Sequence, residues 1–130
     1  MRVRLARLSV RTGISIPPGV FGPGLSVAHH GSIVVNDNAK VGAWCRIHCG
    51  TNIGISRGEA PYIGSFAYIA PGAVVYGGVS LGSRVAVGAN SVVSRDAPEG
   101  VTLAGAPAKV VSNDGSNRVM PEWFPEQDNG

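Results

Sequence analysis

The chain has 130 residues, a length that suits a single domain. Its 19 glycines and 9 prolines follow no Gly-X-Y period, which excludes a collagen-like protein, and its 44% hydrophobic residues exclude a chain disordered throughout. The net charge of +3 is a mild basic bias without the dense basic patch of a nucleic-acid-binding protein, so we expect no nucleic-acid partner.

The N-terminal part of the chain lacks a regular repeat. Residues 1–13 carry four arginines and no acidic residue. We expect a lead-in with at most a short helix there, because about a dozen residues are marginal for an isolated helix. Residues 13–27 are rich in proline and glycine, which favours corners or an edge strand over a central strand.

A six-residue repeat organises the chain from Val35 to Val93. A helix does not match this period, and it would lose about 1 kcal/mol at each interior glycine. Short strands joined by sharp turns do match it: three units close one triangular coil, and residues eighteen apart stack. We therefore predict an all-β fold, a parallel β-helix of about five coils over residues 14–111. The aliphatic positions of the repeat are Val35, Val41, Ile47, Ile53, Ile63, Ile69, Val75, Leu81, Val87 and Val93.

The repeat is interrupted once, between Ile53 and Ile63, where ten residues stand in place of six. Residues 56–61 are predicted to form a loop extruded from a corner, because the coil closes without them. Such loops often carry function.

The last part of the chain leaves the repeat. Residues 101–111 are predicted to add a final apolar strand with a tight turn. Residues 112–130 are polar and rich in proline and glycine, and we expect a flexible C-terminal tail in which Trp123 and Phe124 can dock on a neighbour.

Cysteine content and hydropathy bear on the compartment. Cys45 and Cys49 are too few for a disulfide scaffold, and the sequence has no secretory hydrophobic region and no eighteen-residue apolar run. We expect a cytoplasmic protein with reduced thiols and no membrane partner. Cys45 falls at a small inward position of the repeat and is predicted to fill the core.

Three segments carry a family resemblance. They are GLSVAHHGSIVVNDNAKVGAWCRIH (24–48), YIGSFAYIAPGAVVYGGVSLGSRVAVGANSVV (62–93) and VSRDAPEGVTLAGAPAKVV (93–111). Together they resemble the hexapeptide-repeat acyltransferases, and most closely the serine O-acetyltransferase branch, over roughly residues 14–111. The resemblance implies a left-handed β-helix that packs as a homotrimer, with active sites between subunits.

The resemblance also implies an activity. It is the transfer of an acetyl group from acetyl-CoA to the hydroxyl of serine or a serine-like small acceptor, with no metal. His29, four residues before Ile33, takes the place of the family's catalytic histidine. Histidine suits a general base because its pKa lies near neutrality. Ala28 stands where the family has an aspartate.

The acceptor and cofactor contacts follow from the same resemblance. The family's Asp-Arg-His-Pro loop corresponds here to residues 57–61, so the residues that could bind the acceptor instead are His30, His48, Arg57 and Glu59, with Asp37 as a further candidate. Small residues of the late coils would line the pantetheine groove, and cations would meet the CoA phosphates. These cofactor-binding candidates are Ala70, Pro71, Gly72, Gly88, Ala89, Arg95 and Lys109, with Arg84 as a further cation.

The stacking rule makes its own prediction about the histidines. It places His30 on His48, both outward, and His29 on the inward Ile47. A base inside an aliphatic core cannot act, so either the register shifts near Gly31 or His30 is the base. The family resemblance favours His29.

Three alternatives remain. One is an acetyltransferase that acts on a sugar or a secondary-metabolite hydroxyl or amine, or that uses a longer acyl donor. A second is a metal enzyme of the γ-class carbonic anhydrase type, which needs three histidines around zinc, although adjacent histidines on a strand point to opposite faces. The third is a non-catalytic scaffold.

Overall fold

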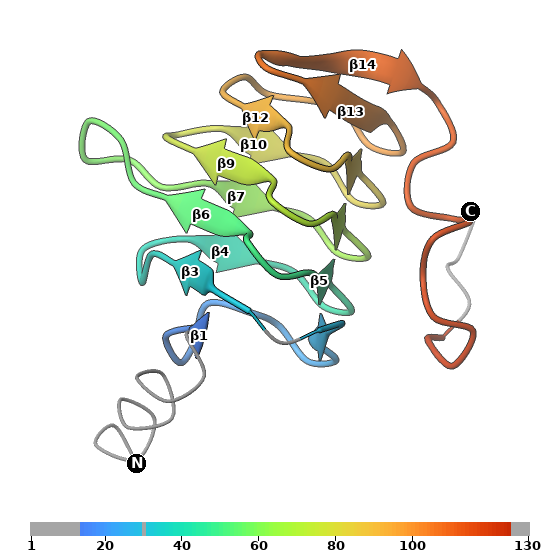
Figure 1. The fold of residues 1–130 in the computed structure, drawn as a ribbon, viewed down its shortest axis with the longest axis horizontal. Helices are drawn as coiled ribbons and strands as arrows, with labels where there is room; N and C mark the ends of the chain where they lie inside the picture. The colour runs from blue at the N-terminus through green and yellow to red at the C-terminus, as the bar shows by residue number, and fades with distance from the viewer. Residues whose placement is uncertain (1–13, 30, 126–130) are drawn as a thin grey trace.

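The computed structural model of the chain describes residues 14–29 and 31–125. The lead-in predicted for residues 1–13 falls outside these residues, as do His30 and residues 126–130. Within the described residues all regular structure is β-strand, arranged in stacked coils (Figure 1).

The strands form three sheets, which we call the first, second and third face in the order in which the chain meets them. The first face contains β1 (Ile14–Ser15), β3 (Ile33–Val35), β6 (Asn52–Gly54), β9 (Val74–Tyr76) and β12 (Val92–Val93). The second contains β4 (Lys40–Val41), β7 (Tyr62–Ile63) and β10 (Ser80–Leu81). The third contains β2 (Ser26–Val27), β5 (Arg46–Ile47), β8 (Tyr68–Ile69), β11 (Ala86–Val87), β13 (Thr102–Gly105) and β14 (Ala108–Ser112).

The corners between successive faces stack into three edges. The first edge joins the first face to the second, the second edge joins the second face to the third, and the third edge returns from the third face to the first. Every pairing between successive coils is parallel, which is the arrangement that the six-residue repeat predicts.

The aliphatic repeat forms continuous inward ladders. On the first face Val35 pairs with Ile53, and Ile53 pairs with Val75. The third face repeats this with Ile47, Ile69 and Val87. The isoleucines of both ladders have no exposed surface, and burial of each such side chain contributes about 1.5–3 kcal/mol. Cys45 is also fully buried, as predicted, and burial raises the pKa of its thiol.

On the second edge a glycine follows the inward aliphatic residue, because neighbouring coils approach each other closely there. A Cβ on Gly42 would lie 2.6 Å from the backbone nitrogen of Ser65, and one on Gly64 would lie 2.5 Å from that of Ser83. The space between these corners is taken by serine hydroxyls: the Ser65 amide donates to Ser83 Oγ at 3.1 Å. The second edge is therefore packed too tightly for a side chain at these positions.

The interruption of the repeat is a loop extruded from the first edge, as predicted, and it projects from the stack after β6 (Figure 1). Ser56 and Glu59 exchange backbone hydrogen bonds of 2.9 and 3.0 Å. Arg57 and Gly58 between them have φ values of 52° and 78°, the conformation of a type I′ turn.

The stacking rule is wrong for the first coil. Val27 pairs with Ile47, which is twenty residues further on rather than eighteen. By β3 the eighteen-residue register is restored, because Val34 pairs with Asn52. The two extra residues therefore lie in the corner between β2 and β3, which contains His29.

The C-terminal region begins with an antiparallel hairpin of β13 and β14, in agreement with the predicted last strand and tight turn. The chain then runs back down the side of the solenoid (Figure 1). Ser116 Oγ donates to the carbonyl of Phe66 at 2.6 Å, and Phe124, 7% exposed, packs against Trp44 with ring centroids 5.4 Å apart. The flexibility expected for residues 112–130 stays a prediction, but the described part of this segment has defined contacts on the second edge.

Candidate active site

The two described histidines meet on the third edge. His29 is exposed, and its ring centroid lies 6.0 Å from that of His48, which is only 8% exposed. On the other side of His48 lies Tyr68, with ring centroids 5.1 Å apart in an edge-to-face arrangement. The predicted stacking of His29 on Ile47 is wrong, and the shift near Gly31 that would release this histidine is present.

The corner that carries His29 is shaped by Gly31. This residue has a φ of 146°, and a Cβ on it would collide with the Cβ of Cys49 in the next coil. The Gly50 amide donates to the Ser32 carbonyl at 2.5 Å, which closes the corner. Because Gly31 packs against Cys49, the coil itself is not displaced, and the two extra residues form a short outward bulge.

His48 is buried without hydrogen-bond partners. Within the described residues neither of its ring nitrogens, Nδ1 or Nε2, has a partner. Its backbone is held by Thr51, whose Oγ1 donates to the His48 carbonyl at 2.8 Å. Burial, the Arg46 guanidinium and His29 all lower the pKa of His48, in that order. This side chain is therefore neutral at pH 7.

The small residues predicted to line the cofactor groove lie on the same edge as His29, one to two coils further along. Pro71 and Ala89 are exposed, and Ala70 is 6% exposed. The amides of Ala70, Gly72 and Gly88 donate within the solenoid at 2.8–3.0 Å. The third edge thus combines an exposed imidazole with a strip of small side chains.

The two loop residues predicted to bind the acceptor lie elsewhere, on the first edge. There Arg57 and Glu59 line a cavity of about 470 Å³ together with Arg95 and Asp96. Within one chain these residues are separated from His29 by the width of the first face.

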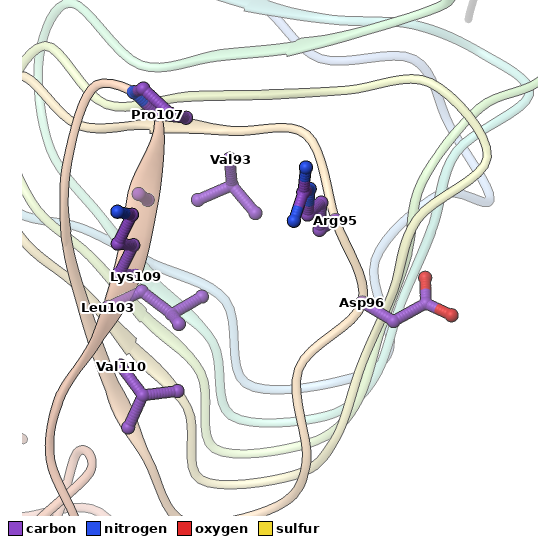
Figure 2. Close-up of a pocket in the computed structure, with 8 residues that line it drawn as sticks. Val93, Arg95, Asp96, Leu103, Pro107, Lys109 and Val110 are labelled. Atoms are coloured by element: carbon purple, nitrogen blue, oxygen red, sulfur yellow. The ribbon is translucent and has the colours of Figure 1, made fainter.

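Two of the predicted cofactor cations meet at the C-terminal end of the solenoid. Arg95 and Lys109 line a second cavity of about 470 Å³, whose floor is formed by Val93 and Leu103. Figure 2 shows the Arg95 and Lys109 side chains on opposite sides of this opening, with the Asp96 carboxylate directed away from it. Arg84, the further cation, pairs instead with Glu99 on the second edge.

Tyr68 and Arg46 are site residues that the sequence analysis missed. Arg46 Nη1 donates to Ser26 Oγ at 3.3 Å, and Tyr68 pairs with Arg46 in the next coil. The four-residue insertion at the first edge moves Tyr68 into this position. An eighteen-residue count without that correction does not find it.

Neither a metal centre nor a membrane span is found in the part of the chain that the structure describes. No group of three His, Cys, Asp or Glu side chains there is placed to hold a metal ion, with His30 outside that part. None of the described segments forms a helix long and apolar enough to cross a membrane.

Comparison with known proteins identifies the family. The family description "Bacterial transferase hexapeptide (six repeats)" matches residues 60–95. A serine acetyltransferase of Synechococcus elongatus is 34% identical over 115 residues, which cover 85% of this chain and 47% of that protein. One from Staphylococcus aureus is 37% identical over 128 residues, which cover 89% of this chain and 60% of that protein.

Solved structures agree with the sequence relatives. The serine acetyltransferase of Neisseria gonorrhoeae superposes with a TM-score of 0.74 at 32% identity, covering 83% of this chain and 43% of that one. That of Brucella abortus gives a TM-score of 0.78 at 28% identity, covering 86% and 47%. This chain spans about half the length of the relatives it matches. Its fold is the left-handed parallel β-helix of these proteins, and the chain belongs to the hexapeptide-repeat transferase family, in the branch that resembles serine acetyltransferases.

Proposed function

We propose that this protein is an acetyl-CoA-dependent O-acetyltransferase that acetylates the hydroxyl of serine or a serine-like small acceptor. The observation that carries the proposal is the exposed imidazole of His29 on the same edge as the strip of small residues. The relatives are named serine acetyltransferases, and among the similar structures one is described as a complex with CoA and another as a complex with serine.

His29 acts as the general base. An alcohol is almost fully protonated at pH 7, so its attack on a thioester needs a group that accepts the proton as the new bond forms. The His29 imidazole takes the hydroxyl proton, the oxygen attacks the thioester carbonyl, and the tetrahedral intermediate collapses with loss of CoA as thiolate. The imidazolium then returns its proton to the thiolate, so the enzyme is restored.

The third edge holds the donor. Ala70, Pro71, Gly72, Gly88 and Ala89 allow the pantetheine arm to lie close to the backbone. The backbone amides of Ala70, Gly72 and Gly88 already donate hydrogen bonds within the solenoid. The backbone carbonyl oxygens each have a second lone pair, so they are the groups that accept hydrogen bonds from the pantetheine amides. Arg95 and Lys109 meet the phosphates at the C-terminal end of the solenoid.

The cavity on the first edge is the candidate acceptor site. Beside Arg95, which is shared with the donor end, its lining combines the Arg57 guanidinium with two carboxylates, Glu59 and Asp96. A zwitterionic amino acid presents one carboxylate and one ammonium group, and this lining complements both. The charge pattern favours an amino-acid acceptor over a neutral sugar.

A homotrimer brings the first edge of one subunit to the third edge of the next. The outward row of the first face is mostly apolar: Val34 pairs with Asn52, Asn52 with Val74, and Val74 with Val92. Val34 is 48% exposed in the single chain. Burial of this row in a closed head-to-tail ring supports the trimer and joins His29 of one chain to Arg57 of another. His30, a further acceptor-binding candidate, lies outside the described residues. The free thiols of Cys45 and Cys49 fit a reducing, cytoplasmic location.

The test is release of free thiol from acetyl-CoA by the purified full chain, with serine as the first of a panel of hydroxyl and amine acceptors. We expect turnover with serine, and a loss of about 100- to 1,000-fold in His29→Ala that exceeds the loss in His30→Ala. Full activity of His29→Ala would overturn the role of the base. Turnover with a sugar hydroxyl but not with serine would favour the alternative function, an acetyltransferase that acts on a sugar. Sedimentation velocity tests the trimer.

A further inference from the structure

The buried imidazole of His48 is left unexplained by the proposed function. A neutral imidazole has one N–H donor and one acceptor nitrogen, and both nitrogens of His48 are buried without a partner among the described residues. Leaving such groups unpaired costs free energy, whereas an apolar side chain would fill the same space at no such cost. A buried unpaired imidazole beside an exposed one therefore indicates a partner that pairs with it during function.

The surroundings of His48 leave His29 as that partner. In the following coil Tyr68 presents its ring to the imidazole at 5.1 Å. In the preceding coil Ala28 lies next to His48, because its amide donates to the Ile47 carbonyl, and its methyl group offers no hydrogen bond. Arg46 carries only donors and points to Ser26. Among the described residues His29, with its centroid 6.0 Å away and its ring tilted by 45°, is the other imidazole within reach.

We propose that His48 is a positioning residue for His29, and that its unprotonated nitrogen accepts the N–H of the His29 ring. This inference rests on the proposed role of His29 as base. One nitrogen of His29 takes the proton from the acceptor hydroxyl, while the other donates its N–H to His48. The bond fixes the tautomer and orientation of His29, and it stabilises the positive charge that His29 acquires.

In this structure the rings of His29 and His48 lie just beyond direct hydrogen-bond distance. A centroid separation of 6.0 Å is slightly longer than a direct hydrogen bond between two imidazoles allows. A small rotation of the exposed His29 ring, or one bridging water, makes the connection. The lowered pKa of His48 supports the proposal, because burial, Arg46 and His29 all keep the ring neutral and its lone pair available. Tyr68 faces the same ring edge to face.

The pairing can be tested without an assay of activity, by NMR titration of the full chain labelled with ¹⁵N-histidine. The chain has only three histidines, so single substitutions assign every imidazole. His48→Phe keeps a ring against Tyr68 but removes both nitrogens, and we expect it to lower the pKa of His29 by about one unit. His29→Gln should raise the pKa of His48, because it removes one of the three causes of the lowering. An unchanged pKa and tautomer of His29 in His48→Phe would overturn the proposal.

Kinetics separate positioning from packing. We expect His48→Phe to lose about 10- to 100-fold in kcat, with an unchanged KM for acetyl-CoA and with the acidic limb of the pH profile moved to lower pH. His48→Gln, which restores a neutral acceptor, should recover part of the loss. In a His29→Ala background His48→Phe should cause no further loss, since two residues that act as a unit are not additive. Independent, multiplying losses would contradict the pairing.

The two proposals fail in different ways. If the wild-type chain transfers no acetyl group to any acceptor, the proposed function fails, while the NMR titration still decides whether the two imidazoles are paired. If acetyl transfer depends on His29 but His48→Phe leaves the pKa of His29 unchanged, only the positioning role of His48 fails. The ¹H–¹⁵N spectrum of each variant reports whether it is folded, and His48→Gln replaces His48→Phe if the latter is not.

Discussion

The first coil and the coils between Tyr62 and Val93 follow the same repeat with different regularity. In the later coils β7, β8 and β9 each pair with the strand eighteen residues on, as Tyr62 does with Ser80 and Val74 with Val92. In the first coil the offsets are 19 for Ile14 with Ile33 and 20 for Val27 with Ile47. The irregular corner holds the exposed His29, whereas the later corners of the same edge, residues 70–73 and 88–91, hold small or short side chains. The regular coils serve as scaffold, and the two extra residues form the bulge that carries a reactive side chain.

The largest effect is expected from making the first coil regular. Deletion of residues 30 and 31 would bring Val27 and Val35 to the six-residue spacing of the repeat and remove the bulge, which would leave His29 at the position of Cys49, Pro71 and Ala89 in later coils and shift its imidazole away from its present place. We expect transfer from acetyl-CoA to fall about 100- to 1,000-fold, as far as in His29→Ala, while the solenoid stays folded. Thiol release and circular dichroism measure the two properties. Retained activity in the deletion variant would show that the bulge is not what positions the base.

A core substitution should separate the two regions by stability. Ile63→Ala removes a fully buried side chain between Val41 and Leu81, and we expect it to lower the free energy of unfolding by about 2–5 kcal/mol. Val27→Ala, at an inward repeat position of the first coil on the third face, should cost less than about 1 kcal/mol because Val27 is 38% exposed. Urea unfolding compares the two variants. Equal losses would mean that the first coil is packed as tightly as the rest, for instance by a neighbouring subunit.

The same contrast explains what could be predicted from the sequence. The inward ladders and the extruded loop follow from counting, because an aliphatic at every sixth position leaves no other period. The first register could not be counted, since Ile33 and Val35 are both buried, at 0% and 3%, and either can continue the repeat. The contact of His48 with Tyr68 depends on how the four-residue insertion is absorbed, and that of Ser116 with Phe66 spans fifty residues. These contacts depend on the closed fold and not on local pattern.

Two glycines should respond differently to alanine. Gly64 lies in a regular corner where an added Cβ would be 2.5 Å from the Ser83 nitrogen, so Gly64→Ala should cost about 1–3 kcal/mol through backbone displacement. Gly58 lies in the extruded loop with open space around it, so Gly58→Ala should cost only about 1–2 kcal/mol for its φ of 78°. Thermal unfolding ranks the pair. A larger loss in Gly58→Ala would mean that the loop, and not the corner, limits stability.

The smallest effect is a pH dependence that originates at the irregular corner. Burial, Arg46 and His29 lower the pKa of His48 below its ordinary value of 6.5, so the folded state favours the neutral ring more than the unfolded state does. The resulting stability is fully present above pH 6.5, and it is lost as the pH falls through the lowered folded pKa, because protons then bind the unfolded chain more readily. Urea unfolding between pH 7 and pH 5 should show a loss of stability in the wild type that is smaller in His48→Gln. The difference between the two curves reports proton binding by His48 together with its effect on His29. Identical curves would mean that the folded and unfolded chains bind this proton alike, and the neutral state of His48, on which its pairing with His29 depends, would then lose its support.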